Sequence, residues 1–194
     1  MNLPRVCAGI LFCFLSSLLV AQDQFPSTKK HKFSIYGGGG PNHYFNNIVQ
    51  LKSQVNEFNY SFAARIMWEP EHNLSLGIET GYYRLYSLDV KKLLKKTNIK
   101  NSAIPIQVVL SMKFLKTFYF NFSMGRSILI NDITSDAHGN FDATTFSWAD
   151  FASSVGYRHK LNDRFSLSAE AKFYYASKAD DKNLALLFLF GYRL

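Results

Sequence analysis

The sequence predicts an all-β fold, an eight-stranded antiparallel up-and-down transmembrane β-barrel, and three observations lead to it. Segments with the two-residue alternation of a strand follow one another with no amphipathic helix of useful length between them. Short connections alternate with long ones, which places the short turns at one end of the sheet. Each strand carries one large apolar file, rich in Phe and Tyr, and one small polar file with isolated charges.

The N-terminal residues 1–21 predict a cleaved secretory signal peptide. Arg5 precedes an apolar run from Val6 to Val20, and the small residue Ala21 stands just before the polar Gln22. The run is short for a bilayer-spanning helix, which needs about 20 residues. We therefore expect export and not a membrane anchor. Residues 22–31 are interpreted as a short polar linker and residues 32–194 as the barrel.

Both cysteines of the chain, Cys7 and Cys13, fall inside this segment, so the mature protein is expected to depend on packing and hydrogen bonds without a disulfide. The bulky Phe12 stands where a lipoprotein signal has a small residue, which argues against a lipid anchor. Removal of the segment lowers the formal net charge from +8 to +7, because Arg5 is its only charged residue. This charge favours anionic surfaces as partners.

Most of the predicted strands have the roughly 9–11 residues that a tilted strand needs to cross a membrane. The eight segments are, in order, Lys32–Phe45, Glu57–Trp68, Leu74–Leu88, Ile104–Phe114, Phe118–Asn131, Thr144–His159, Phe165–Ser177 and Asn183–Leu194. Tight turns are predicted at Glu69–Asn73, Leu115–Thr117 and Leu161–Arg164. The longer polar connections are Asn46–Asn56, Asp89–Ala103 and Asp132–Ala143, followed by the shorter segment "KADDK".

The first predicted strand is rich in glycine, whereas the second and third each have an apolar file and a polar file. The first contains four consecutive glycines, Gly37–Gly40, which resemble a phosphate-cradling loop, but no helix and no Lys-Ser/Thr pair follows. We therefore expect a bent or closely packed strand there. In the second strand the apolar file from Phe58 to Trp68 opposes a file that contains Arg65, and in the third strand the polar file contains Glu79.

The fourth and fifth strands have continuous apolar files, from Ile104 to Phe114 and from Phe118 to Met124. Arg126 then falls on the apolar parity, and the alternation of Thr144–Phe151 in the sixth strand changes phase. This irregularity predicts a β-bulge or a position above the hydrocarbon.

The seventh strand, "FSLSAEAKFYY", has an apolar face that we expect to meet lipid, so that Glu170 and Lys172 point into the barrel. An eight-stranded barrel is only just wide enough for its own side chains, which predicts a plugged cylinder and not a wide pore. The charges of the inward parity are expected to form a lumen ion network. Its members are Arg65, Glu79, Lys113, Arg158, Glu170, Lys172 and Arg193. Strand folding predicts the pairs Arg65–Glu79 and Glu170–Arg193; the alternative is a gated conduction path.

Three segments resemble the small outer-membrane β-barrels of the PorT-like and OmpA-like type found in Bacteroidota: the signal peptide ending in "VAQ", the strand "AIPIQVVLSMKF" and the last strand "LLFLFGYRL". The resemblance implies a place in the outer membrane of the cell and recognition of the last strand by the barrel-assembly machinery. It also implies a structural, binding or secretion-accessory role with a secretion-system or other envelope protein as partner. Members include proteins of unknown function, so the role stays open.

No enzyme, metal site or cofactor is expected. Only His43 and His138 could reach the external side, with Ser135, Asp136 and Asp142 nearby in sequence, and such a polar loop is ordinary. No histidine or carboxylate pair has ligand spacing on a common face.

The second long connection is a candidate loop for binding anionic lipid, because it concentrates positive charge where lipopolysaccharide phosphates would lie. Its lysines are Lys91, Lys92, Lys95, Lys96 and Lys100. A solvated charged loop is the alternative. A nucleic-acid partner is excluded by the envelope address.

A second reading of the whole chain is a soluble exported barrel that binds a hydrophobic ligand, as lipocalins do. It requires the aromatic files to face inward and the charged files outward. The direction of Phe120, Phe122, Phe173 and Phe188 distinguishes the two readings.

Overall fold

The computed structural model describes residues 32–45, 55–70, 73–92, 95–135, 139–178 and 180–194, which form nine strands. The strands are β1 Lys32–Phe45, β2 Val55–Asn56, β3 Phe58–Glu69, β4 Leu74–Lys92, β5 Lys95–Phe114, β6 Phe118–Ser135, β7 Gly139–Lys160, β8 Phe165–Ala176 and β9 Asp181–Arg193. Within these ranges, no helix is long and apolar enough to cross a membrane. The predicted signal peptide and linker lie outside them.

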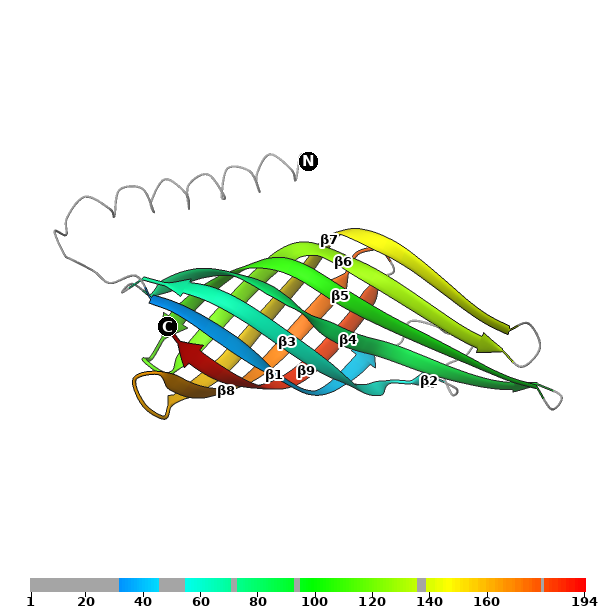
Figure 1. Cartoon of the computed structure of the whole chain (residues 1–194), viewed down its shortest axis with the longest axis horizontal. Coiled ribbons are helices and arrows are strands. Elements are labelled where there is room, and N and C mark those ends of the chain that lie inside the picture. The colour runs from blue at the N-terminus through cyan, green and yellow to red at the C-terminus, as the bar shows by residue number, and fades with distance from the viewer. Residues whose placement is uncertain (1–31, 46–54, 71–72, 93–94, 136–138, 179) are drawn as a thin grey trace, which may run out of the picture. The chain divides into compact units, whose positions relative to one another are not determined.

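Eight of the strands close into an antiparallel barrel, as predicted (Figure 1). Consecutive long strands pair around the ring from β3 through β4 to β9, and β1 closes it by pairing with both β3 and β9. The short β2 precedes β3 in the chain and pairs with the same strand, β4, through Val55–Leu88 and Asn56–Ser87, beyond the end of the β3–β4 pairing. Closure leaves no long strand with a free edge along its whole length, which removes the main route to edge-to-edge aggregation.

The apolar files face outward and the polar files face inward. Phe120, Phe122, Phe173 and Phe188 are 37–57% exposed, whereas Asn121 and the other inward polar residues of the central barrel are buried. The reading of a soluble barrel with an apolar ligand cavity is therefore wrong, because it needs the reverse arrangement.

The short turns lie together at one end of the barrel. They join β3 to β4, β5 to β6 and β7 to β8, and the predicted turn at Leu115–Thr117 is tight enough that Leu115 and Lys116 both adopt positive φ. The C-terminal residue lies at the same end, where the Leu194 N–H donates to the Phe33 carbonyl at 2.9 Å. We call this end the short-turn end.

Two predicted loops are wrong, because strands continue through them. The connection predicted at Asp89–Ala103 belongs mostly to β4 and β5, and that predicted at Asp132–Ala143 belongs mostly to β6 and β7. The apolar alternation ends where one face stops meeting an apolar medium, but the backbone ladder of an antiparallel pair continues in water. The two hairpins extend away from the short-turn end (Figure 1).

The predicted bulge is confirmed. Gly125 pairs with Asp150 and Ser127 with Ser147, so that the single residue Arg126 faces two residues of β7. The Arg126 guanidinium lies 4.3 Å from the ring centroid of one of them, Trp148, on the outer face. A second irregularity, between Arg84 and Tyr86 of β4, was not predicted.

The glycine run of β1 allows a close approach to β9. A Cβ atom on Gly38 would meet the Phe188 carbonyl oxygen, and one on Gly40 would meet that of Leu186. The closely packed strand expected there is therefore confirmed, at the seam that closes the barrel.

We expect Gly38→Ala to lower the free energy of unfolding by about 1–3 kcal/mol, because the added methyl overlaps the β9 backbone. Gly37→Ala is the matched control, since a Cβ there meets nothing within 4 Å, and it should change stability by less than about 0.5 kcal/mol. Equilibrium urea unfolding followed by tryptophan fluorescence measures both. Equal midpoints for the two variants would contradict the close approach.

Candidate functional site

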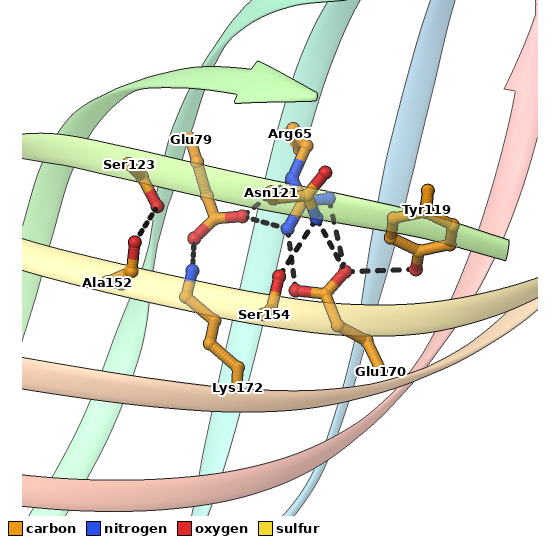
Figure 2. Close-up of polar contacts among 9 residues, drawn as sticks. All are labelled: Arg65, Glu79, Tyr119, Asn121, Ser123, Ala152, Ser154, Glu170 and Lys172. Carbon is orange, nitrogen blue, oxygen red and sulfur yellow. Dashed lines mark hydrogen bonds and ion pairs between the residues drawn. The ribbon is translucent and has the colours of Figure 1, made fainter. Parts of the chain in front are cut away.

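The interior of the barrel holds its charged side chains at separate levels. The central network consists of Arg65, Glu79, Glu170 and Lys172 (Figure 2). The mouth cluster, at the short-turn end, consists of Tyr36, Glu69, Lys113, Arg158 and Arg193. The predicted single network is therefore divided into two groups, and Glu69 and Tyr36 were not among its predicted members.

Arg65 connects the two carboxylates of the central network. Its Nε donates to Glu79 Oε2 at 2.6 Å, and its Nη2 donates to Glu170 Oε1 at 2.9 Å. Lys172 Nζ contacts the other oxygen of Glu79. All four side chains are at most 3% exposed, and their two positive and two negative charges balance. Such balance offsets the desolvation of charges in a closed interior.

Neutral groups complete the hydrogen bonding of Glu170. Tyr119 donates its hydroxyl to Glu170 Oε2 at 3.0 Å, and Asn121 Nδ2 donates to the same oxygen at 3.2 Å and to Ser154 Oγ at 2.9 Å. These residues come from β6, β7 and β8, so the network links both sides of the lumen (Figure 2).

Register explains one of the two predicted pairs. Arg65 and Glu79 are direct cross-strand partners in β3 and β4, which is the relation predicted from folding the chain about its turn. Lys172 reaches Glu79 from β8, which lies on the opposite side of the ring of strands from β4. This contact crosses the lumen, and no pattern among neighbouring residues in the sequence predicts it.

The predicted pair Glu170–Arg193 is wrong. The backbone partner of Glu170 in β9 is Leu187, and Arg193 lies six residues farther along that strand, a distance of about 20 Å at the usual rise per residue. Arg193 Nη2 instead lies 3.5 Å from Glu69 Oε2.

Glu69 organises the mouth cluster. It accepts from the Tyr36 hydroxyl at 2.6 Å, from Lys113 Nζ at 3.1 Å and from Arg158 Nη1 at 2.9 Å, in addition to its contact with Arg193. Sequence reasoning assigned Glu69 to a turn, but it is the last residue of β3. Glu69 lies four residues after Arg65 and therefore on the same, inward face of the strand, and this spacing could have identified it as a lumen residue.

A further buried carboxylate, Asp150, lies toward the end opposite the short turns. It is fully buried and accepts from the Ser177 backbone N–H at 3.0 Å and the Tyr174 hydroxyl at 3.2 Å, and it also contacts Ser147 Oγ. Sequence parity could not identify this residue, because the bulge in β7 changes which face it occupies.

The residues considered for catalysis do not form a cluster in the described part of the chain. His43 Nε2 lies 4.0 Å from Glu57 Oε2, and Ser135 Oγ lies 3.2 Å from Thr97 Oγ1. Asp136 and His138 lie outside the described residues. Within the described ranges, no three His, Cys, Asp or Glu side chains are grouped as a metal site would require.

The lysine-rich segment forms the end of the β4–β5 hairpin. The backbone register pairs Lys91 with Lys96 and Lys92 with Lys95, while the side chains of these four residues lie outside the described part. Lys100 pairs with Ser87 and is half-buried. The segment is thus strand and not loop, as far as its described backbone extends.

Comparison with known proteins gives a family and a fold. Residues 12–193 match the family model described as the outer membrane protein beta-barrel domain. No curated protein matches the chain by sequence. The crystal structure of Ail, the attachment invasion locus protein of Yersinia pestis, in complex with the heparin analogue sucrose octasulfate, is 13% identical, with a TM-score of 0.56 over 85% of this chain and 99% of that one. Neisserial surface protein A is 12% identical, with a TM-score of 0.50 over 82% and 96%.

We expect Glu79→Gln to destabilise the barrel by about 3–5 kcal/mol, because Lys172 is then buried without a carboxylate partner. The double variant Glu79→Gln/Lys172→Met should be more stable than the sum of the two single changes predicts, by about 1–3 kcal/mol. Urea unfolding in detergent micelles measures the cycle, with the more exposed Lys182→Met as control. Simple additivity would show that the two side chains do not interact.

Proposed function

Because this chain belongs to the outer membrane protein β-barrel domain family, we propose that it is a closed, non-enzymatic barrel with a structural, binding or secretion-accessory role. The protein lies in the outer membrane. The observation that carries the proposal is the central network, in which Glu79 and Lys172 meet across the lumen.

In this proposal the lumen is a plug and not a path for solutes. Arg65 and the two glutamates join β3, β4 and β8 at the level where the interior is narrow enough for side chains to fill it. The large inward rings of Tyr83 and Tyr174 add to the filling, since they are fully buried and stack with centroids 5.1 Å apart. Activity then belongs to the ends of the barrel.

The short-turn end is proposed to face the periplasm and the extended hairpins to face the cell exterior, following the general arrangement of outer-membrane barrels. Insertion by the barrel-assembly machinery fits this orientation, with β9 as the last strand. The finer assignment to the PorT-like type of Bacteroidota is supported by the strands "AIPIQVVLSMKF" and "LLFLFGYRL". This assignment implies a secretion-system protein or another envelope protein as partner.

We further propose that the end of the β4–β5 hairpin binds anionic lipid, such as lipopolysaccharide. Cross-strand partners of like charge are destabilising, yet the register places Lys91 opposite Lys96 and Lys92 opposite Lys95. A polyanion that bridges these positions would relieve the repulsion. Binding of a polysulfated ligand by Ail, a barrel of similar fold, supports the idea that such barrels can recognise anions.

Single-channel recording in planar bilayers tests the plug. We expect no conductance steps from the wild type and no change in Glu79→Gln, because glutamine has nearly the same volume and the filled lumen persists. Thr80→Ala, which alters the neighbouring outward side chain of the same strand, is the matched control. New conductance in Glu79→Gln alone would favour the gated path.

Replacement of Lys91, Lys92, Lys95, Lys96 and Lys100 by glutamine should weaken lipopolysaccharide binding about tenfold or more at low salt, because several charge contacts are lost together. The control is Lys178→Gln/Lys182→Gln, which alters lysines at or beside the connection between β8 and β9. Surface-bound lipopolysaccharide and purified protein in detergent give the affinity. Unaltered binding in the five-lysine variant would leave the hairpin as a solvated surface.

A further inference from the structure

The mouth cluster carries more positive charge than its own carboxylate can balance. Lys113, Arg158 and Arg193 all meet the single carboxylate Glu69, so the four groups together have a net charge of +2. The central network, by contrast, is neutral. The excess of positive charge therefore belongs to the mouth cluster and is not shared by the central network.

Arg158 is held in a fixed orientation within the cluster. Its guanidinium carbon lies 4.5 Å from the ring centroid of Tyr36 and 4.9 Å from that of Tyr119, while Nη1 donates to Glu69. Contacts of a guanidinium with aromatic faces are attractive. The side chain is therefore preorganised, which lowers the entropy lost when a ligand binds to it.

Donors in the cluster remain unused. The buried Nε–H groups of Arg158 and Arg193 have no hydrogen-bond acceptor among the described residues. Buried polar groups in proteins are nearly always hydrogen-bonded. Hydrogen bonding in the cluster is therefore incomplete at these two Nε–H groups, although an Nη atom of each arginine contacts Glu69.

A cavity of about 350 Å³ opens beside the mouth cluster. Lys113, Arg158 and Arg193 line it, and Lys116 and Lys160 add further positive charge at its rim. The carboxylate of Asp163 belongs to a smaller neighbouring hollow of about 20 Å³, which Arg158 and Arg193 also line. The larger cavity itself contains basic side chains and no acidic one among its described lining residues.

We propose that this cavity is a binding site for a phosphate group, carried by a small molecule or by a phospholipid head group. A phosphate dianion would balance the +2 charge of the cluster and accept hydrogen bonds from the cationic side chains that line the cavity. Arginine favours phosphate because its planar fork can donate two parallel hydrogen bonds. The site lies at the end opposite the β4–β5 hairpin and does not depend on the function proposed for that hairpin.

The test uses the full-length mature barrel in nanodiscs and two sources of phosphate. In the first arm, inorganic pyrophosphate is titrated calorimetrically into nanodiscs of zwitterionic lipid. In the second arm, retention of phosphatidic acid, whose head group is a phosphate monoester, from mixed nanodiscs is measured by native mass spectrometry. We expect binding in at least one arm, and the arm that responds identifies the free or the lipid-borne source.

The variants separate a binding site from a structural cluster. Lys113→Gln should weaken binding about tenfold through loss of one charge contact, and Glu69→Gln should strengthen it about tenfold because the internal competitor for the cations is removed. If Glu69→Gln does not fold, Lys116→Gln at the exposed rim replaces it, with weaker binding expected. Lys182→Gln should bind as the wild type. Absence of binding in both arms, or a Lys113→Gln affinity equal to that of the wild type, would overturn the proposal.

Discussion

The width of a closed eight-stranded barrel is the constraint on which the rest of this structure depends. A ring of this size leaves an interior that side chains fill, so an inward charge must meet an opposite charge inside the protein. Glu79 of β4 and Lys172 of β8 meet this requirement across the lumen, and Arg65 joins both glutamates of the central network. Closure at the β1–β9 seam, where Gly38 permits close approach, makes these contacts possible.

Charge balance differs along the lumen. The central network is neutral and is supported by Tyr119 and Asn121, so its charges are satisfied internally. At the end opposite the short turns, Asp150 is surrounded by hydroxyl donors and one backbone N–H. The mouth cluster alone of these three levels combines a surplus of cations with unused donors and an adjoining cavity. This combination is the basis for the phosphate site proposed at the short-turn end of the lumen.

The two long hairpins show how the same backbone ladder serves two environments. In the barrel, the ladder separates an apolar outer face from a filled lumen, and the backbone pairing of β4 with β5 and of β6 with β7 continues beyond it. Local irregularities lie on this path, at Arg84–Tyr86 and opposite Arg126. The contact of Arg126 with Trp148 places a cation and an amphipathic ring on the outer face, a combination that suits the boundary between lipid and water.

Local sequence patterns predicted the barrel, the direction of its faces, its tight turns, the bulge opposite Arg126 and the close packing of the glycine run; they are the alternation of residues, the lengths of the connections, the turn-forming residues and the four glycines. Each of these follows from neighbouring residues, because a strand between two unlike environments records both of them at a period of two. The extent of the hairpins could not be predicted from them, since backbone pairing continues after the apolar medium ends. Only the tertiary structure decided that Arg65, and not Arg193, meets Glu170, and that Glu69 joins three cations. Partner choice depends on register and on contacts across the lumen, and these relate residues that no local pattern connects.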